Sequence, residues 1–376
     1  MMTPLFVLAA GGTGGHMFPA EALASELRAR GYRVALVTDR RGRSFDGHMS
    51  DVAVHRIHAA SVMGRGIFKR IRALATIALG LVEAGWLLRR LRPAVVVGFG
   101  GYPSVPTLLA ASLTKVPIVV HEQNAVLGRA NRALAPRAAV IATSFAETEA
   151  IAPGDRAKVA HTGNPVRAQV LDLATHIYEA PAADAALHMV VTGGSQGARV
   201  FADVVPSAVA SLPKDMRDRL RITQQCRPED MERSAQVYHD AEVVADLAPF
   251  FADIARRLKT AHLVICRAGA STLAELTVAG LPSILVPLPG AIDDHQTINA
   301  LPLIAAGAGW LMAQDEFNPS SLARRLFTLM REPATLEAAS VAARRLSIVD
   351  AAERLADVVE RLGLPGRTSV TVGEPA

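Results

Sequence analysis

The chain has 376 residues, of which 50% are hydrophobic and 20% are charged, a composition typical of a globular protein with room for two domains. Its two cysteines, Cys226 and Cys266, form no disulfide framework and lack metal-ligand spacing, which argues against a disulfide-rich secreted fold. The opening residues Met1 to Pro4 contain no basic segment of the kind that precedes an export signal.

Short apolar runs typical of strands alternate with helical patterns along the whole chain. This alternation predicts an α/β fold in which helices cover both faces of parallel sheets. Strands are expected in the first half at Leu5–Ala9, Arg33–Thr38, Ala94–Gly98, Ile118–His121, Val140–Ala142 and Lys158–His161. In the second half they are expected at His188–Thr192, Leu220–Gln224, Glu242–Asp246, Leu263–Cys266, Ser283–Val286 and Gly309–Met312.

A turn-forming cluster, Gly163-Asn164-Pro165, separates the two halves. We therefore predict an N-terminal domain over 1–163 and a C-terminal domain over 164–346. A helix is expected at about 347–363, and residues 364–376 resemble a flexible tail.

Three glycine-containing loops each follow an apolar strand and begin a helix. They are Ala10–His16, Gly193–Arg199 and Arg267–Thr272. Glycine lets the backbone adopt turns closed to other residues and approach an oxyanion closely, and the following helix adds free N–H groups. These loops predict phosphate binding. A dinucleotide-binding enzyme remains an alternative interpretation, because Asp39 follows the second strand. However, neither main loop has the G-x-G-x-x-G spacing of such enzymes, and no Walker motif is present.

Positive charge is concentrated in the first half of the chain. Residues 1–166 carry 20 Lys+Arg and 10 Asp+Glu, and residues 167–376 carry 20 and 25, so the halves hold +10 and −5 of the net +5. The segment Gly64–Arg92 places Arg65, Lys69, Arg70 and Arg72 before the apolar run Ala73–Val82. That run is about half the roughly 20 residues of a membrane span, so the segment is either a buried helix or one that lies on an anionic membrane. Without a recognition motif, nucleic-acid binding is not expected.

Six motifs together resemble the MurG family, the undecaprenyldiphospho-muramoylpentapeptide β-N-acetylglucosaminyltransferases of peptidoglycan synthesis. They are Gly11-Gly12-Thr13-Gly14-Gly15-His16, Gly100-Gly101-Tyr102, His121-Glu122-Gln123-Asn124, Gly163-Asn164-Pro165-Val166-Arg167, Gly193-Gly194-Ser195-Gln196-Gly197-Ala198 and Arg267-Ala268-Gly269-Ala270. The resemblance implies a GT-B fold of two Rossmann-like domains facing across a cleft, with the helix at about 347–363 returning to the first domain. The motifs span roughly residues 5–360 in register.

The resemblance also implies a reaction. N-acetylglucosamine from UDP-N-acetylglucosamine (UDP-GlcNAc) is transferred, with inversion, to the C4 hydroxyl of lipid I, the polyprenyl-diphosphate-linked MurNAc-pentapeptide, giving lipid II. Such enzymes serve cell-wall biogenesis, and hence cell shape and division, as peripheral proteins on the cytoplasmic face of the bacterial inner membrane. Other cell-wall synthesis proteins are possible partners. No cofactor or metal is expected, because GT-B enzymes use helix ends where other transferases use a metal.

The resemblance also implies which residues form the site, at the positions that match the motifs of the family. The resemblance implies that UDP-GlcNAc is bound by Thr13, Gly14, Gly15, Asn124, Arg167, Ser195, Phe251, Ala270, Ser271, Thr272, Leu273, Ala274, Glu275 and Gln296. Glu275 resembles the carboxylate that accepts from the ribose hydroxyls, although a glutamate in this helix could also be merely solvated. Independently of the family, donors at the starts of two helices suit a diphosphate leaving group.

Attack by a sugar hydroxyl requires a base of near-neutral pKa. His16, at the end of the first glycine loop, is the leading candidate, and the matching histidine of the family has this role. His16 could instead orient phosphate or cap the helix. Glu122 is the rival base, since burial can raise the pKa of a carboxyl group.

The sequence leaves three other classes of protein as alternatives. A UDP-GlcNAc 2-epimerase would share the fold and the donor, but should lack the basic and apolar segment at 64–92. A nicotinamide oxidoreductase would show cofactor absorbance. A membrane-bound nucleotide sensor would bind the sugar nucleotide without turnover.

Overall fold

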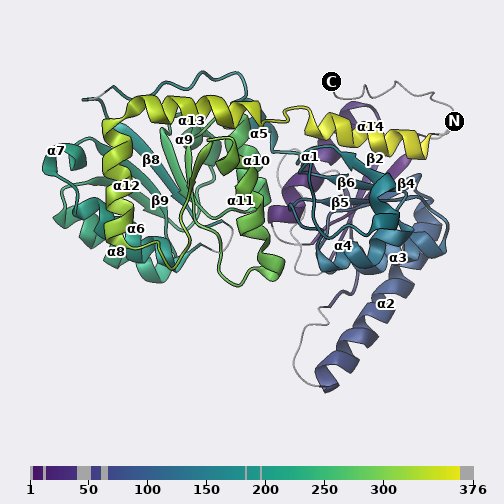
Figure 1. Cartoon of the computed structure of the whole chain (residues 1–376). Helices are drawn as coiled ribbons and strands as arrows, with labels where there is room; N and C mark the ends of the chain where they lie inside the picture. The colour runs from purple at the N-terminus through teal and green to yellow at the C-terminus, as the bar shows by residue number, and fades with distance from the viewer. Residues whose placement is uncertain are drawn as a thin grey trace. The chain divides into compact units, whose positions relative to one another are not determined.

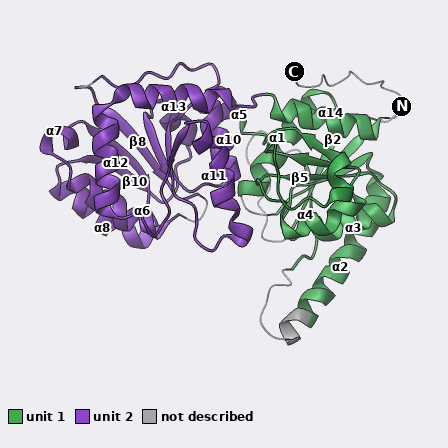
Figure 2. Ribbon diagram, viewed as in Figure 1, with its two compact units in different colours: residues 1–167, 350–376 green, residues 168–349 purple. Residues whose placement is uncertain are grey.

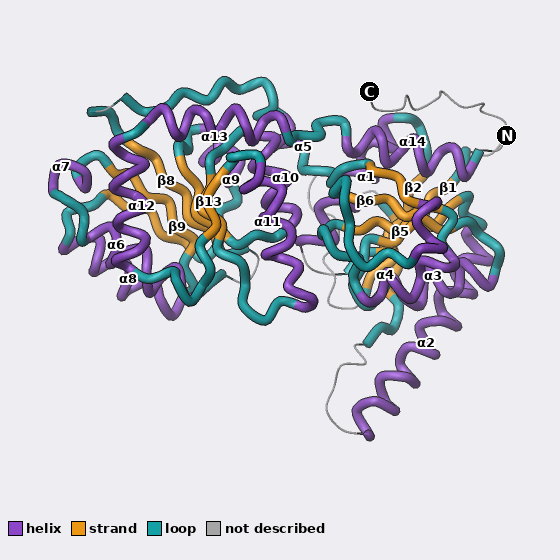
Figure 3. Tube along the Cα trace, viewed as in Figure 1, coloured by secondary structure: helices purple, strands orange, loops and turns teal. Residues whose placement is uncertain are grey.

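The computed structural model describes residues 3–11, 14–39, 52–60, 67–182, 184–194 and 197–364. The chain divides into two compact units, one formed by Met1–Arg167 with Asp350–Ala376 and the other by Ala168–Val349 (Figure 2). The division falls after Arg167 rather than at the Gly163 cluster. In each unit, strands form a central sheet with helices around it (Figure 3).

Unit 1 contains a seven-stranded parallel sheet in the order β3-β2-β1-β4-β5-β6-β7. Figure 1 labels the helices of this unit and several of its strands. The strands are β1 Leu5–Ala9, β2 Arg33–Thr38, β3 Ala53–Arg56, β4 Val95–Gly98, β5 Ile118–Glu122, β6 Val140–Thr143 and β7 Val159–His161. The helices are α1 Gly14–Ala29, α2 Ile67–Leu91, α3 Ser104–Leu113, α4 Arg129–Leu134 and α14 Ala351–Gly363, with 3₁₀ turns η2 Ala135–Arg137 and η3 Pro153–Lys158.

Both faces of this sheet are buried, as the apolar strands predict. Successive side chains of a strand point to opposite faces. In β1, Phe6 and Leu8 therefore belong to the core that includes α1 and α14, whereas Val7 and Ala9 belong to the core that includes α2 and α3.

The C-terminal helix α14 belongs to unit 1 although it follows unit 2 in the chain. Leu355 and Val359 are buried in the same core as α1. The Arg30 guanidinium of the loop after α1 donates to Asp357 at 2.6 Å and lies 3.2 Å from Glu360, which adds charged contacts to this packing.

Unit 2 contains a six-stranded parallel sheet in the order β10-β9-β8-β11-β12-β13. The strands are β8 Leu187–Thr192, β9 Leu220–Gln225, β10 Val244–Ala248, β11 Leu263–Cys266, β12 Ser283–Leu285 and β13 Gly309–Leu311. The helices are α5 Ala168–Leu171, α6 Arg199–Ala210, α7 Lys214–Arg217, α8 Pro228–Asp240, α9 Ile254–Lys259, α10 Ala270–Ala279, α11 His295–Ala305, α12 Pro319–Arg331 and α13 Pro333–Arg345, with the 3₁₀ turn η4 Ile292–Asp294.

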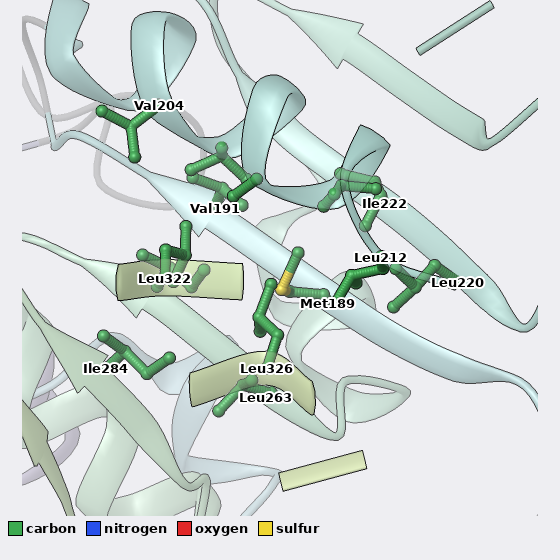
Figure 4. Close-up of a cluster of buried hydrophobic side chains, with 14 of the residues drawn as sticks. Met189, Val191, Val204, Leu212, Leu220, Ile222, Leu263, Ile284, Leu322 and Leu326 are labelled. Carbon is green, nitrogen blue, oxygen red and sulfur yellow. The ribbon is translucent and has the colours of Figure 1, made fainter. Parts of the chain in front are cut away.

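The larger core of unit 2 lies between the sheet and helices α6 and α12. Met189 and Val191 of β8 meet Leu322 and Leu326 of α12 in this cluster (Figure 4). Val190, on the opposite face of β8, belongs to a second cluster with residues of α10, α11 and α13.

The predicted α/β class and two parallel sheets are confirmed. One strand was missed: β3, Ala53–Arg56, which pairs with β2 at the edge of the sheet. Its side chains are half-buried or exposed, so it lacks the apolar run by which the other strands were found. Residues 365–376, expected to be a tail, lie outside the described residues.

Candidate active site

The first glycine loop follows β1, and its described glycines pack against the loop after β4. The Gly11 N–H donates to the Gly100 carbonyl at 3.1 Å. Gly101 has a φ of +79°, and a Cβ there would lie 2.6 Å from the Gly11 Cα. Neither loop could approach the other in this way with larger residues. Gly12 and the predicted contact Thr13 lie outside the described residues.

The start of α1 leaves room for a ligand group. A Cβ added to Gly15 would meet no atom within 4 Å, whereas one added to Gly14 would lie 2.9 Å from the Phe18 ring. The Arg167 guanidinium lies 4.5 Å from the centre of the same ring, a cation–π contact. Three predicted donor contacts, Gly14, Gly15 and Arg167, are thus brought to one end of α1.

His16 lies on the first turn of α1, partly buried beside Gly100. Its Nδ1 is 3.2 Å from the Gln123 side-chain oxygen. Burial lowers the pKa of His16 below 6.5, and the Gln123 bond, the Glu122 charge and the Phe99 carbonyl only partly oppose this. The ring is therefore neutral at pH 7, the form that a general base requires.

Glu122 lies at the end of β5 and is 2% exposed. One carboxylate oxygen accepts from the backbone N–H and side-chain amide of Asn124, both at 3.0 Å. The other accepts from the Gly128 N–H at 2.8 Å and the Asn131 amide at 2.7 Å. Four donors already engage the two oxygens, so this geometry favours a role in holding the loop and favours His16 over Glu122 as the base. Asn124, a predicted donor contact, shares this loop.

The second glycine loop follows β8 in unit 2. Gly194 and Gly197 have φ values of +78° and +67°, which favour glycine. The Gln225 side-chain oxygen accepts from the Thr192 hydroxyl at 2.9 Å and the Gly193 N–H at 3.2 Å, and its amide donates to the Gly194 and Pro249 carbonyls. One side chain thus holds the loop shape. Ser195, the predicted contact, lies outside the described residues.

The third loop leads into α10, which begins at Ala270 after an extended Gly269. Ala270 and Leu273 are buried, so these two can offer a ligand only backbone groups, whereas Ser271 and Thr272 are partly exposed. Ala274 and Glu275 follow on the same helix, and Glu275 retains 9% exposure. The helix start therefore combines backbone N–H groups with hydroxyls, an arrangement suited to an anion.

Two further predicted contacts have defined surroundings in unit 2. The Gln296 side-chain oxygen accepts from the Leu288 N–H at 2.9 Å, which ties the first turn of α11 to the loop after β12. Phe251 is 8% exposed, and the Arg257 guanidinium lies 4.1 Å from its ring centre. A ligand would therefore reach Phe251 mainly through its backbone.

Sequence reasoning missed several polar residues that shape these loops. Arg267 donates to the Val286 and Pro287 carbonyls and to Gln314, joining the loops after three strands of unit 2. Gln123 and Gln225 lie at or just after the carboxyl ends of β5 and β9. A polar residue at such a strand end was the available signal, because ligand sites of parallel sheets lie there.

Helix α2 exposes an apolar stripe. Ile71, Leu74, Leu79, Val82 and Trp86 are 47–70% exposed. They recur at helical spacing and therefore share one side of the helix. By length and composition, Ile71–Leu91 is the described helix that could cross a membrane. The side chains of Ile67 to Arg70, and all of Arg65, lie outside the described residues.

The other end of α2 is fixed to unit 1. Ala84, Leu87 and Leu88 are buried in its core. The Glu83 carboxylate accepts from the His58 N–H at 2.8 Å and lies 2.7 Å from the His58 Nδ1. The segment thus has a buried end and an exposed apolar stripe.

Among the described residues, no group of three or more histidine, cysteine or acidic side chains is placed to hold a metal ion.

Comparisons with known proteins identify both units. The glycosyltransferase family 28 N-terminal domain matches residues 6–143, and the family 28 C-terminal domain matches residues 188–358. A UDP-N-acetylglucosamine–N-acetylmuramyl-(pentapeptide) pyrophosphoryl-undecaprenol N-acetylglucosamine transferase of Rhodospirillum centenum is 54% identical, over 97% of this chain and 95% of that protein.

Solved structures agree with this result. The crystal structure of Acinetobacter baumannii MurG superposes with a TM-score of 0.74 at 29% identity, covering 95% of this chain and all of that one. The UDP-GlcNAc 2-epimerase of Neisseria meningitidis, solved with UDP-GlcNAc, shares the fold with a TM-score of 0.64 but only 14% identity, over 96% of this chain and 100% of that one. With both halves matched in order and half of its residues shared with such a transferase, the chain belongs to the MurG family of N-acetylglucosamine transferases.

Proposed function

We propose that this enzyme transfers N-acetylglucosamine from UDP-GlcNAc to the C4 hydroxyl of the MurNAc sugar of lipid I, forming lipid II with inversion at the transferred carbon. The observation that carries the proposal is the 54% identity to a transferase named for these substrates, over 97% of the chain. The geometry of the described loops supports the same reaction.

In the proposed step, the acceptor oxygen forms a bond to C1 of N-acetylglucosamine while the bond from C1 to the diphosphate oxygen breaks. The hydroxyl proton passes to the unprotonated nitrogen of His16, and UDP leaves with the bonding electron pair. The lowered pKa of His16 supports this role, because the ring is ready to accept a proton at pH 7.

Negative charge develops on the departing UDP. The start of α10 offers backbone N–H donors that are already in place. Such preorganised donors stabilise developing charge without further rearrangement. We assign Glu275 to the ribose hydroxyls, while Arg167, Asn124 and Gln296 complete the predicted donor contacts. No metal or cofactor enters this scheme.

We further propose that the enzyme is peripheral on the cytoplasmic face of the inner membrane, docked through α2. Crossing the bilayer would remove Ala84, Leu87 and Leu88 from the core of unit 1, whereas lying on it would cover the exposed stripe. Arg72, Arg89 and Arg90 are exposed on the same helix and suit anionic headgroups. Partners in cell-wall synthesis would gain access to lipid II at this surface.

The 2-epimerase remains the second candidate from the sequence, and it is less well supported. The epimerase of Neisseria meningitidis shares 14% identity, which shows the fold alone. A nicotinamide oxidoreductase and a non-enzymatic sensor have no support from the relatives, which are transferases.

The decisive assay measures UDP release from UDP-GlcNAc with and without a lipid I analogue. Acceptor-dependent release together with a new disaccharide supports the transferase. Acceptor-independent conversion of UDP-GlcNAc to its C2 epimer would support the epimerase instead. Binding without UDP release or epimerisation would indicate a sensor.

A further inference from the structure

A chain of hydrogen bonds connects His16 to the segment that leaves unit 1. The His121 ring is fully buried, and its Nε2 lies 3.3 Å from the Gly163 carbonyl. Its Nδ1 lies 2.9 Å from the Gln123 amide nitrogen, and the Gln123 oxygen lies 3.2 Å from the His16 Nδ1. Gln123 is 4% exposed and bridges the two rings.

The surroundings fix which way the Gln123 amide faces. Its nitrogen is also 3.2 Å from the His121 backbone carbonyl, which can only accept a hydrogen bond. The reversed amide would place two acceptor oxygens against each other there. The nitrogen therefore faces His121, and the oxygen faces His16.

This orientation determines the proton positions along the chain. The Gly163 carbonyl requires a proton on the His121 Nε2, so the His121 Nδ1 is free to accept from Gln123. The Gln123 oxygen in turn requires a proton on the His16 Nδ1. The neutral His16 ring then carries its lone pair on Nε2, the reverse of the tautomer that free histidine prefers.

We propose that Gln123 is a positioning residue that selects the Nδ1–H tautomer of His16 and so presents Nε2 as the proton acceptor. The inference deepens the proposed role of His16 as the base. His121 acts through Gln123, because its own tautomer is set by the Gly163 carbonyl. The Phe99 carbonyl and the charge of Glu122 also act on the His16 ring, and both raise its pKa.

Long-range ¹H–¹⁵N correlation spectra of the full chain, labelled in histidine, test the tautomer directly. Comparison with His16→Ala assigns the His16 signals. At pH 7.5 the wild-type protein should show a protonated Nδ1 and an unprotonated Nε2. In Gln123→Leu the proton should move towards Nε2. A wild-type ring protonated on Nε2, or a folded Gln123→Leu protein with unchanged His16 signals, would overturn the proposal.

Gln123→Glu provides a second variant that keeps an acceptor towards His16. It should retain the Nδ1–H signal and raise the pKa of His16 by roughly one unit, because a carboxylate stabilises the charged ring. Gln123→Leu should lower kcat roughly three- to tenfold with little change in the donor KM. A Gln123→Glu spectrum identical to that of Gln123→Leu would also contradict the proposal.

The spectrum and the kinetics separate this inference from the proposed function. If His16→Ala leaves kcat unchanged, His16 is not the base, while the spectrum still reports whether Gln123 sets its tautomer. Gln225→Ala serves as the matched control, since the hydrogen bonds of Gln225 go to the loop after β8 and to Pro249 in unit 2, and the variant should leave the His16 signals unchanged.

Discussion

Two glutamines perform different tasks in the two units, although each lies at or beside the end of a parallel strand near a glycine loop. Gln225 of unit 2 bonds backbone groups of Gly193, Gly194 and Pro249 and the Thr192 hydroxyl. Gln123 of unit 1 instead bonds two histidine rings. In the proposed mechanism, the same fold plan would serve anion binding in unit 2 and proton transfer in unit 1, depending on which side chain meets the loop.

The strongest test of this comparison removes the His16 ring from unit 1. His16→Ala should lower kcat by about a hundredfold or more, as expected for the loss of a general base, while UDP affinity stays near normal. In the wild-type protein the rate should fall only as the pH falls through the lowered pKa of His16, below 6.5. If the acidic limb persists in His16→Ala, the base lies elsewhere, and Glu122→Gln should be measured next.

Unit 1 should also lose stability in acid through His121. Burial lowers the pKa of this ring from 6.5 to about 4, so the unfolded chain binds the proton first as the pH falls. The contribution of His121 to the free energy of unfolding should be fully retained above pH 6.5. It should decline by about 3 kcal/mol as the pH falls towards 4.

Denaturant unfolding at a series of pH values measures this effect. His121→Asn should flatten the slope between pH 6.5 and 4, whereas His239→Asn, at an exposed histidine, should leave it unchanged. An unchanged slope in His121→Asn would show that the buried ring does not drive acid sensitivity.

Glu275 tests the binding role assigned to unit 2. Glu275→Ala should raise the donor KM roughly ten- to hundredfold, because losing a hydrogen bond to a charged group costs about 1.5–3 kcal/mol. The acceptor KM should change little. Glu337→Ala, at an exposed glutamate of α13, is the control. An unchanged donor KM in Glu275→Ala would remove this residue from the site.

Gln225→Ala sharpens the contrast between the glutamines. Losing four hydrogen bonds to the loop should raise the donor KM about tenfold, since each net bond contributes roughly 0.5–1.5 kcal/mol and the loop can partly rearrange. The pH profile of kcat should keep its shape. Gln236→Ala, which removes an exposed glutamine from α8, should affect neither quantity. A shifted pH profile in Gln225→Ala would break the proposed division of tasks.

The last prediction concerns the binding of α2 to a membrane. Leu74→Ser with Val82→Ser should weaken flotation with anionic vesicles, and replacing Arg65, Lys69, Arg70 and Arg72 by glutamine should release the protein, at about 1 kcal/mol for each charge. Activity on a short soluble acceptor should persist. Leu301→Ser with Val341→Ser removes matching exposed side chains from unit 2 as the control. Wild-type flotation of both α2 variants would place the membrane contact elsewhere.

Local patterns in the sequence determined much of this protein. The apolar runs predicted all but one of the described strands, because residues buried on both faces of a parallel sheet must be apolar. The glycine loops and His16 were found for a similar reason, since their function depends on residue type and on immediate neighbours. The predicted nucleotide contacts beyond these loops came from the resemblance to a family and stay predictions.

Only the tertiary structure decided which residues that are distant in the sequence lie in contact. His16 meets Gln123 across 107 positions, and Glu122 is engaged by donors from the loop and from α4, which the sequence could not show. Likewise, α2 has one periodic pattern, yet its buried end and exposed stripe depend on what packs beside it. Long-range packing sets these surroundings, whereas residue order sets only the elements that pack.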